Sequence, residues 1–219
     1  MVMSLELDIE KNNKKICELS HNYDFIHGLY WIQKSRIGEG LVILKKELNK
    51  GGFVGVKFHG SFEELPVTAS VYQPIMKLLN EKNSILLVHA GRYKDGSPES
   101  NTSYYHPLKL AKNYPNIRII IAHMGGNDTS IVKEAVDNAK NIPNVYFDTS
   151  GITTPFRIEY ATKIIGPERI IFGSDSPWCS YRAMYYCVED AMIDEEAKEL
   201  IFSKNFSSLL NKEKKLKHL

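Results

Sequence analysis

The sequence predicts an α/β fold in which a parallel sheet carries a polar site along one edge. Six short apolar segments alternate with segments of helical periodicity along the chain. Several apolar segments are rich in Ile, Val, Leu and Phe on both faces, which is typical of buried parallel strands. Five of them end in a side chain that can bind a metal ion, and these are GFVGVKFHG, SILLVHAG, IRIIIAHMGG, VYFDTSG and RIIFGSDSPW.

The spacing of the strand ends supports a regular strand–helix repeat. Strands are expected near residues 25–32, 53–59, 84–89, 117–123, 144–148 and 169–174. The last four strand ends fall at residues 89, 123, 148 and 175, in steps of 34, 25 and 27 residues. A strand–helix–strand unit needs about thirty residues, so each step accommodates one strand, one helix and two loops.

The segments between the strands predict helices. Apolar residues recur at helical spacing over residues 70–80, and Pro107 is expected to open the next helix, where its missing N–H costs little. Asp128 and its two neighbours offer N-caps for a third helix, and Asp194 is expected to start the last one.

Length and composition exclude several classes of protein. With 219 residues, the chain is expected to form one domain over residues 1–219. A formal net charge of +2 and the lack of a long apolar segment predict neither nucleic acid nor a membrane as partner. The N-terminus becomes charged too early for a signal peptide. Three cysteines without a CxxC or other zinc spacing indicate reduced thiols and a cytoplasmic location.

His89, His123 and Asp175 form the strongest set of candidate functional residues. Each follows a strand directly and stands before a Gly or Ser–Pro turn. Imidazole and carboxylate are the usual ligands of Zn²⁺, Mn²⁺ and Fe²⁺, and a bound ion lowers the pKa of its water towards neutrality. The sequence therefore predicts a divalent metal site, with zinc as the first choice.

Two further residues point to the same face of one strand. Lys57 and His59 are two positions apart, and Gly55 on that face allows close packing. Lys57 is expected either to bind substrate or to pair with Asp148 or Asp175 and hold the core together, because an unpaired buried charge is costly. His59 is expected either to contact substrate or to cap its strand.

A long polar stretch from Arg92 to Tyr105 follows the strand that ends at His89. It is interpreted either as a loop lining the site or as a surface loop. In the first case Arg92 pairs with a substrate carboxylate. Trp178, which follows the last strand, is also assigned to substrate binding.

Taken in order, HPLKLAKNYPNIRIIIAHMGG, VYFDTSG and RIIFGSDSPW resemble the amidohydrolase-related (amidohydrolase 2) family of metal-dependent TIM barrels. That family contains hydrolases and also decarboxylases similar to aminocarboxymuconate-semialdehyde decarboxylase. The resemblance covers roughly residues 25–210 and implies that the six strands are strands three to eight of the barrel. It implies that His89 is a metal ligand, that His123 is a second ligand or polarises substrate, and that Asp175 is a ligand and proton acceptor.

One element of the family pattern is absent. The first barrel strand of such proteins ends in His-x-His, and no HxH occurs in this chain. The sequence therefore predicts an incomplete barrel that lacks its first two strands, or a start inside a longer reading frame. Removing two strands leaves open sheet edges, which predicts a homodimer that covers them.

The resemblance implies metal-dependent hydrolysis of an amide- or lactone-type C–N or C–O bond in a small carboxylated molecule. Metal-activated water is the expected nucleophile, with Asp175 and His123 as the catalytic residues. Two alternatives stay open: non-oxidative decarboxylation within the same family, and a catalytically impaired remnant that serves as a binding subunit.

Overall fold

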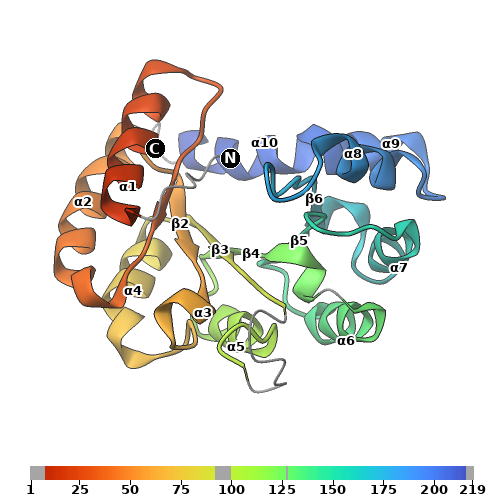
Figure 1. Cartoon of the computed structure of the whole chain (residues 1–219), viewed down its shortest axis with the longest axis horizontal. Coiled ribbons are helices and arrows are strands. Elements are labelled where there is room, and N and C mark those ends of the chain that lie inside the picture. Colours follow the sequence, from red (N-terminus) through yellow and green to blue (C-terminus); the bar gives the residue numbers. More distant parts are fainter. Residues whose placement is uncertain (1–7, 92–99, 127, 216–219) are drawn as a thin grey trace.

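The computed structural model describes residues 8–91, 100–126 and 128–215, with side chains described as far as residue 210. Its centre is a sheet of six parallel strands in the order β1-β2-β3-β4-β5-β6, so every strand pairs with its neighbour in the chain (Figure 1). The strands are Leu29–Trp31, Gly55–Phe58, Ile85–Val88, Arg118–Ile121, Val145–Asp148 and Ile170–Ile171. All six expected strands are thereby confirmed, and the fold is the α/β class that the sequence predicts.

Helices surround the sheet, and most of them cover its outer face (Figure 1). The core on that face joins alternate strand residues, among them Val56, Leu86, Ile119 and Phe147, to the apolar sides of the helices. The helices are α1 (Ile9–Asn22), α2 (Ile37–Lys50), α3 (Gly60–Glu63), α4 (Gln73–Glu81), α5 (Tyr105–Asn113), α6 (Thr129–Ala139), α7 (Pro155–Ile165), α8 (Tyr181–Glu189), α9 (Glu195–Glu199) and α10 (Asn205–Lys215).

The helix starts follow the predicted capping chemistry with one correction. Asp128 caps α6 by accepting from the Ser130 N–H at 2.8 Å, and Asp194 caps α9 through the Ala197 N–H at 2.7 Å. Pro107 does not open its helix, because α5 begins at Tyr105 and the proline is its third residue. The first four N–H groups of a helix have no partner within it, so proline is tolerated there as well.

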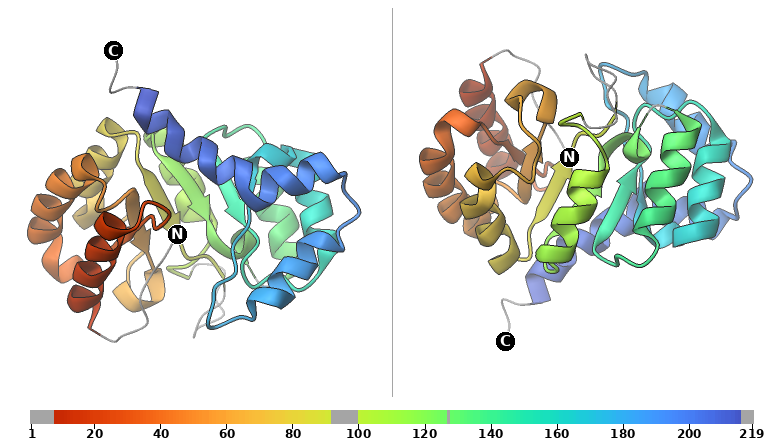
Figure 2. Two further views of the ribbon diagram at one scale, coloured as in Figure 1. Left: turned by 90° about the horizontal axis from the view of Figure 1, so that it is seen from above. Right: turned by 90° about the horizontal axis from the view of Figure 1, so that it is seen from below.

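The inner face of the sheet is covered by the C-terminal helix. Figure 2 shows α10, in blue, crossing one face of the sheet while α4, α5 and α6 lie on the other. Leu209 is buried there among inward-facing strand residues such as Leu29, Leu87 and Ile120. The buried Arg118 guanidinium donates to the Leu209 carbonyl and ties α10 to β4. The amino-terminal part of this face is therefore closed by α10.

Polar groups from elsewhere in the chain bond to both edge strands. At β1, the Asn13 amide donates to the Trp31 carbonyl at 3.0 Å and accepts from the Trp31 N–H at 2.8 Å. At β6, the Phe172 N–H donates to the Ile201 carbonyl at 2.8 Å, and the Asn205 amide donates to the Ile170 carbonyl at 2.7 Å. The edges on which the expected homodimer depends are thus partly occupied by groups of the chain itself, at Trp31 on one side and at Ile170 and Phe172 on the other.

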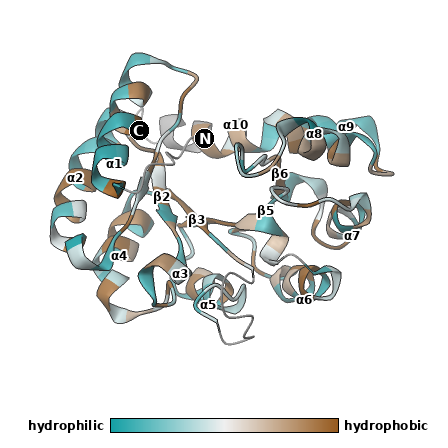
Figure 3. Cartoon of the chain, in the orientation of Figure 1, coloured by the Kyte–Doolittle hydropathy of each residue, from teal (hydrophilic) through white to brown (hydrophobic). Residues whose placement is uncertain are grey.

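The hydropathy of the helices agrees with this layering. In Figure 3 the strands are mostly apolar, and several helices carry apolar residues beside polar ones. Among the described residues, no helix is long and apolar enough to span a bilayer.

Candidate functional site

The carboxyl ends of β2 and β3 place two histidines side by side. Phe58 pairs with Val88, so His59 and His89, which follow them, leave the sheet at the same level. Their rings stack with centroids 3.8 Å apart and an interplanar angle of 13°. The sequence prediction that strand-end residues meet at one edge is correct for this pair.

A third histidine, from the end of β4, completes this cluster. The Nε2 atom of His123 lies 3.1 Å from the Nδ1 atom of His89, and the two rings meet edge to face at 73°. Because the two ring nitrogens face each other at hydrogen-bond distance, one proton lies between them. Three adjacent parallel strands therefore bring His59, His89 and His123 together.

The end of β5 fixes the orientation of His123. One Asp148 oxygen, Oδ1, accepts from the backbone N–H groups of His123 and Ser150, both at 3.0 Å, and from the Ser150 hydroxyl. The Nδ1 atom of His123 lies 3.0 Å from the Ser150 carbonyl and 2.9 Å from its hydroxyl oxygen. Since the hydroxyl proton goes to Asp148, both Ser150 oxygens act as acceptors and Nδ1 carries the proton. The Nε2 lone pair then faces His89.

Asp148 and Ser150 were not among the site residues predicted from the sequence. The sequence did give one indication of Asp148: it ends a strand in the segment VYFDTSG, just as the predicted ligands end theirs. Ser150 lies in the turn after this strand and contacts His123 from there, and no residue pattern in the sequence predicts that contact. Both are positioning residues, because they contact His123 rather than the open edge of the site.

Burial keeps two of the histidines neutral. Burial first, and the nearby Lys57 charge second, lower the pKa of His59 to about 3 and that of His89 well below its ordinary value. A neutral imidazole keeps the lone pair that a metal ion or a proton donor requires. The cluster therefore has the electronic state of a ligand set.

Lys57 lies on the same inward face as this cluster. Its side chain is buried, and burial lowers the pKa of its ammonium group to about 8, although the charges of Asp148 and Asp175 act in the opposite direction. Among the described residues, Lys57 forms no ion pair within 4.0 Å. The alternative of a tight structural pair with Asp148 or Asp175 is therefore not what the structure shows.

Asp175 follows β6 in a turn with a left-handed backbone, at φ 50°. Its carbonyl accepts from the Cys179 N–H at 3.1 Å, and it acts electrostatically on Lys57. His89, His123 and Asp175 do not form a compact ligand set in the described ranges. Their ligand atoms do not all lie within 4.8 Å of one another. The structure thus brings the two histidines together, and Asp175 is not at ligand distance from both.

The remaining predicted residues have different positions. Trp178 is 73% exposed, so its assigned contact with substrate stays a prediction. Arg92 lies outside the described residues. An aromatic wall that sequence analysis did not identify stands beside the cluster: Trp31 stacks parallel to His59 at 6.2 Å, and Phe62 meets the two rings edge-on.

Comparison with protein families decides how this chain is classified. A family model described as Amidohydrolase matches residues 19–206, which is most of the chain. The chain belongs to this amidohydrolase family. The resemblance predicted from the strand-end motifs is confirmed. No curated protein matches this chain.

Solved structures share the fold of this amidohydrolase-family protein at low identity. The 5-carboxyvanillate decarboxylase of Sphingomonas paucimobilis superposes with a TM-score of 0.74 at 12% identity, over 92% of this chain and 71% of that one. The 2,6-dihydroxybenzoate decarboxylase of Rhizobium gives 0.74 at 17% identity, over 92% and 76%. A dihydroxybenzoic acid decarboxylase of Polaromonas with bound manganese gives 0.72 at 18% identity, over 92% and 74%. These similarities support a (βα) barrel-type fold.

Proposed function

We propose that this amidohydrolase-family protein is a metal-dependent enzyme that decarboxylates a small carboxylated molecule without oxidation. The observation that carries the proposal is the buried Lys57 on the inward face of the sheet, which also bears the neutral histidine cluster. A buried ammonium group without a close ion pair favours an anionic ligand, and a carboxylate is the simplest. Three solved structures of the same fold are named as decarboxylases.

The donor set fits a divalent ion in part. His89 and His123 supply two imidazoles whose facing nitrogens lie 3.1 Å apart, and the proton between them would have to move to the other ring nitrogen of His89 before both lone pairs could face an ion. Asp175, the third proposed ligand, is too far from the two histidines to share an ion with both. The turn that carries Asp175 would have to change its conformation to complete the set. When bound, the ion would polarise the oxygens of the substrate. Manganese is the ion named in two solved structures of similar fold, whereas zinc was the first choice from the sequence. Imidazole and carboxylate ligands suit both ions.

The residues of the chain have separate roles in this reaction. The Lys57 ammonium group binds and orients an anionic oxygen of the substrate. The rings of Trp31, His59 and Phe62 contact a planar substrate and exclude water. As the bond to the carboxyl carbon breaks, its electron pair stays on the substrate and carbon dioxide leaves. Asp175, half-buried at the rim of the site, passes one proton from solvent to that carbon.

Hydrolysis of a C–N or C–O bond is the second candidate. It is the activity first expected from the sequence, and the description of the matching family favours it. In this reaction Asp175 accepts the proton of the attacking water, and His123, once its Nε2 atom has taken up a proton, donates to the oxygen on which charge develops. The same residues serve both reactions, so only substrates distinguish them.

The experiment measures turnover and metal content together. The protein is stripped with a chelator, supplied with Mn²⁺ or Zn²⁺, and incubated with hydroxybenzoates and, separately, with lactones and N-acyl amino acids. Release of carbon dioxide from the first group is expected. His89→Asn and Asp175→Asn should each lower turnover at least a hundredfold. Lys77→Ala on the exposed side of α4 is the matched control and should retain full activity.

Two results would contradict the proposal. Turnover of lactones or amides alone would assign hydrolysis instead. No turnover, together with no uptake of either ion by the wild-type protein, would identify the chain as the impaired remnant that the missing HxH raises as an alternative.

A further inference from the structure

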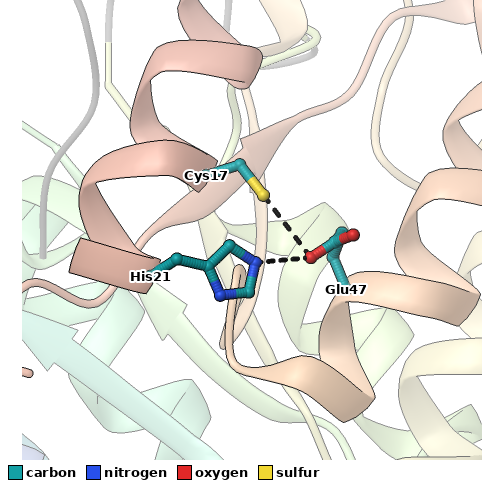
Figure 4. Close-up of side chains that lie close together, drawn as sticks. All are labelled: Cys17, His21 and Glu47. Atoms are coloured by element: carbon teal, nitrogen blue, oxygen red, sulfur yellow. Dashed lines mark hydrogen bonds and ion pairs between the residues drawn. The ribbon is translucent and has the colours of Figure 1, made fainter.

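A second cluster of metal-binding side chains joins α1 to α2, outside the site at the sheet edge. Cys17 and His21 are four residues apart on α1 and therefore share a face, and Glu47 reaches them from α2 (Figure 4). The Glu47 Oε2 atom lies 2.8 Å from His21 Nε2 and accepts from the Cys17 thiol at 3.6 Å. In the described part of the chain, these three residues form a group of metal-binding side chains whose ligand atoms all lie within 4.8 Å of one another.

The three ligand atoms converge beside a glycine. A Cβ placed on Gly52 would lie 2.5 Å from Glu47 Oε2, 2.6 Å from Cys17 Sγ and 2.8 Å from His21 Nε2. No side chain with a Cβ fits at this position without moving all three groups. The lack of a side chain at Gly52 therefore keeps the space between sulfur, nitrogen and oxygen open.

We propose that Cys17, His21 and Glu47 bind a zinc ion, with a fourth coordination position open to solvent. One thiolate, one imidazole and one carboxylate are all zinc ligands, and the sulfur disfavours magnesium, calcium and manganese. All three residues line a pocket of about 810 Å³, formed mainly by residues of α1 and α2. A site with three protein ligands and an accessible fourth position is the pattern of a zinc site that can bind a further small ligand.

Zinc would take the place of the hydrogen bonds that now join Cys17 and His21 to Glu47. Without a cation, the Cys17 thiol keeps its proton, because burial and the Glu47 charge raise its pKa to about 11. Binding forms the sulfur–zinc bond and releases that one proton to solvent, while the ring proton of neutral His21 is held on Nδ1 so that the Nε2 lone pair faces the ion. The other carboxylate oxygen of Glu47, Oε1, stays beside the Lys46 ammonium group at 3.2 Å.

Cobalt provides a direct readout of the sulfur ligand. Co²⁺ is added to the chelator-treated full chain carrying His89→Asn, which weakens the site at the sheet edge. A near-ultraviolet thiolate-to-cobalt charge-transfer band is expected at one ion per chain. Excess Zn²⁺ should abolish it. Cys17→Ser should remove the band completely, and Cys179→Ser, the matched cysteine control near Asp175, should retain it.

A second variant separates metal binding from folding. Gly52→Ala leaves all three ligands in the chain but places a methyl group between them, and the backbone at this position is not in the left-handed region. Co²⁺ binding is expected to weaken at least tenfold, while far-ultraviolet circular dichroism stays that of the wild type. In the His89→Asn background, zinc should also raise the melting temperature of the chain that keeps Cys17 and not that of the chain with Cys17→Ser.

Either of two results would overturn the proposal. One is a wild-type chain that gives no thiolate band on adding cobalt. The other is a band that persists in Cys17→Ser. Both would identify the cluster as a set of hydrogen bonds that only holds α1 against α2.

Discussion

At the scale of single residues, the backbone of His123 shows how the site is held. His123 and Met124 both adopt left-handed conformations, at φ 55° and 50°. Such conformations cost roughly 1–2 kcal/mol per residue for L-amino acids. The Asp148 oxygen that accepts from the His123 N–H offsets this cost and aims the ring at His89. The strain therefore lies where the functional ring must be oriented.

Lys57 predicts a specific dependence of stability on pH. Its pKa falls from 10.5 in the unfolded chain to about 8 in the folded protein because of burial. Between these values the unfolded state binds more protons, so this group makes the free energy of unfolding rise with pH. The difference of about 2.5 pKa units corresponds to about 3 kcal/mol.

Lys57→Met tests this dependence. The variant keeps most of the side-chain volume and removes the titrating group. Urea unfolding of metal-free protein at pH values from 7 to 10.5 should show wild type gaining about 3 kcal/mol relative to the variant. Parallel curves for the two proteins over this window would contradict the burial of the charged group.

At the scale of elements, α10 provides the side chains that cover the inner face of the sheet, which in a closed barrel would come from the strands themselves. Its residues Phe206, Leu209 and Leu210 pack against the inward side chains of the sheet. Without it, this apolar face would be exposed, because the six strands do not close on themselves in the described residues. The inner core of the protein therefore depends on its last helix.

Leu209→Ala measures that dependence. Leu209 is 2% exposed, and removing a buried leucine side chain costs about 2–5 kcal/mol. We expect a loss of this size in the free energy of unfolding from urea titrations. Ser207→Ala, on the exposed side of the same helix, should change stability by less than about 0.5 kcal/mol. Equal effects of the two variants would show that α10 does not cover the sheet in solution.

The strands could be predicted from the sequence, and parts of the site could not. Continuous Ile- and Val-rich segments at a regular spacing reveal buried parallel strands, because both faces of such strands are covered. The meeting of His89 and His123 follows from that topology. The position of Asp175 depends on a turn, and the roles of Ser150 and Asn13 depend on single hydrogen bonds, which leave no periodic pattern. Cys17 and His21 stand at helical spacing, but Glu47 joins them only through the packing of α1 on α2.

At the scale of the whole molecule, the two sheet edges govern how copies of the chain can associate. The expected homodimer rested on open edges. However, Asn13 bonds to the N–H and carbonyl of Trp31 at β1, and Ile201 and Asn205 bond to groups of the chain at β6. Covering an edge in this way prevents pairing with another chain. The homodimer stays a prediction, and pairing through these edges would first have to displace these bonds.

Asn13→Ala tests whether the edge cap controls association. The substitution leaves the N–H and carbonyl of Trp31 without their side-chain partner, which costs about 1–3 kcal/mol and exposes a strand edge. Light scattering after size exclusion should show species larger than wild type whose share rises with concentration. Lys15→Ala, on the exposed side of α1, should have the wild-type mass. If Asn13→Ala also kept the wild-type mass at all concentrations, Asn13 would not be what keeps β1 from pairing, and dimerisation through that edge would again be an open route.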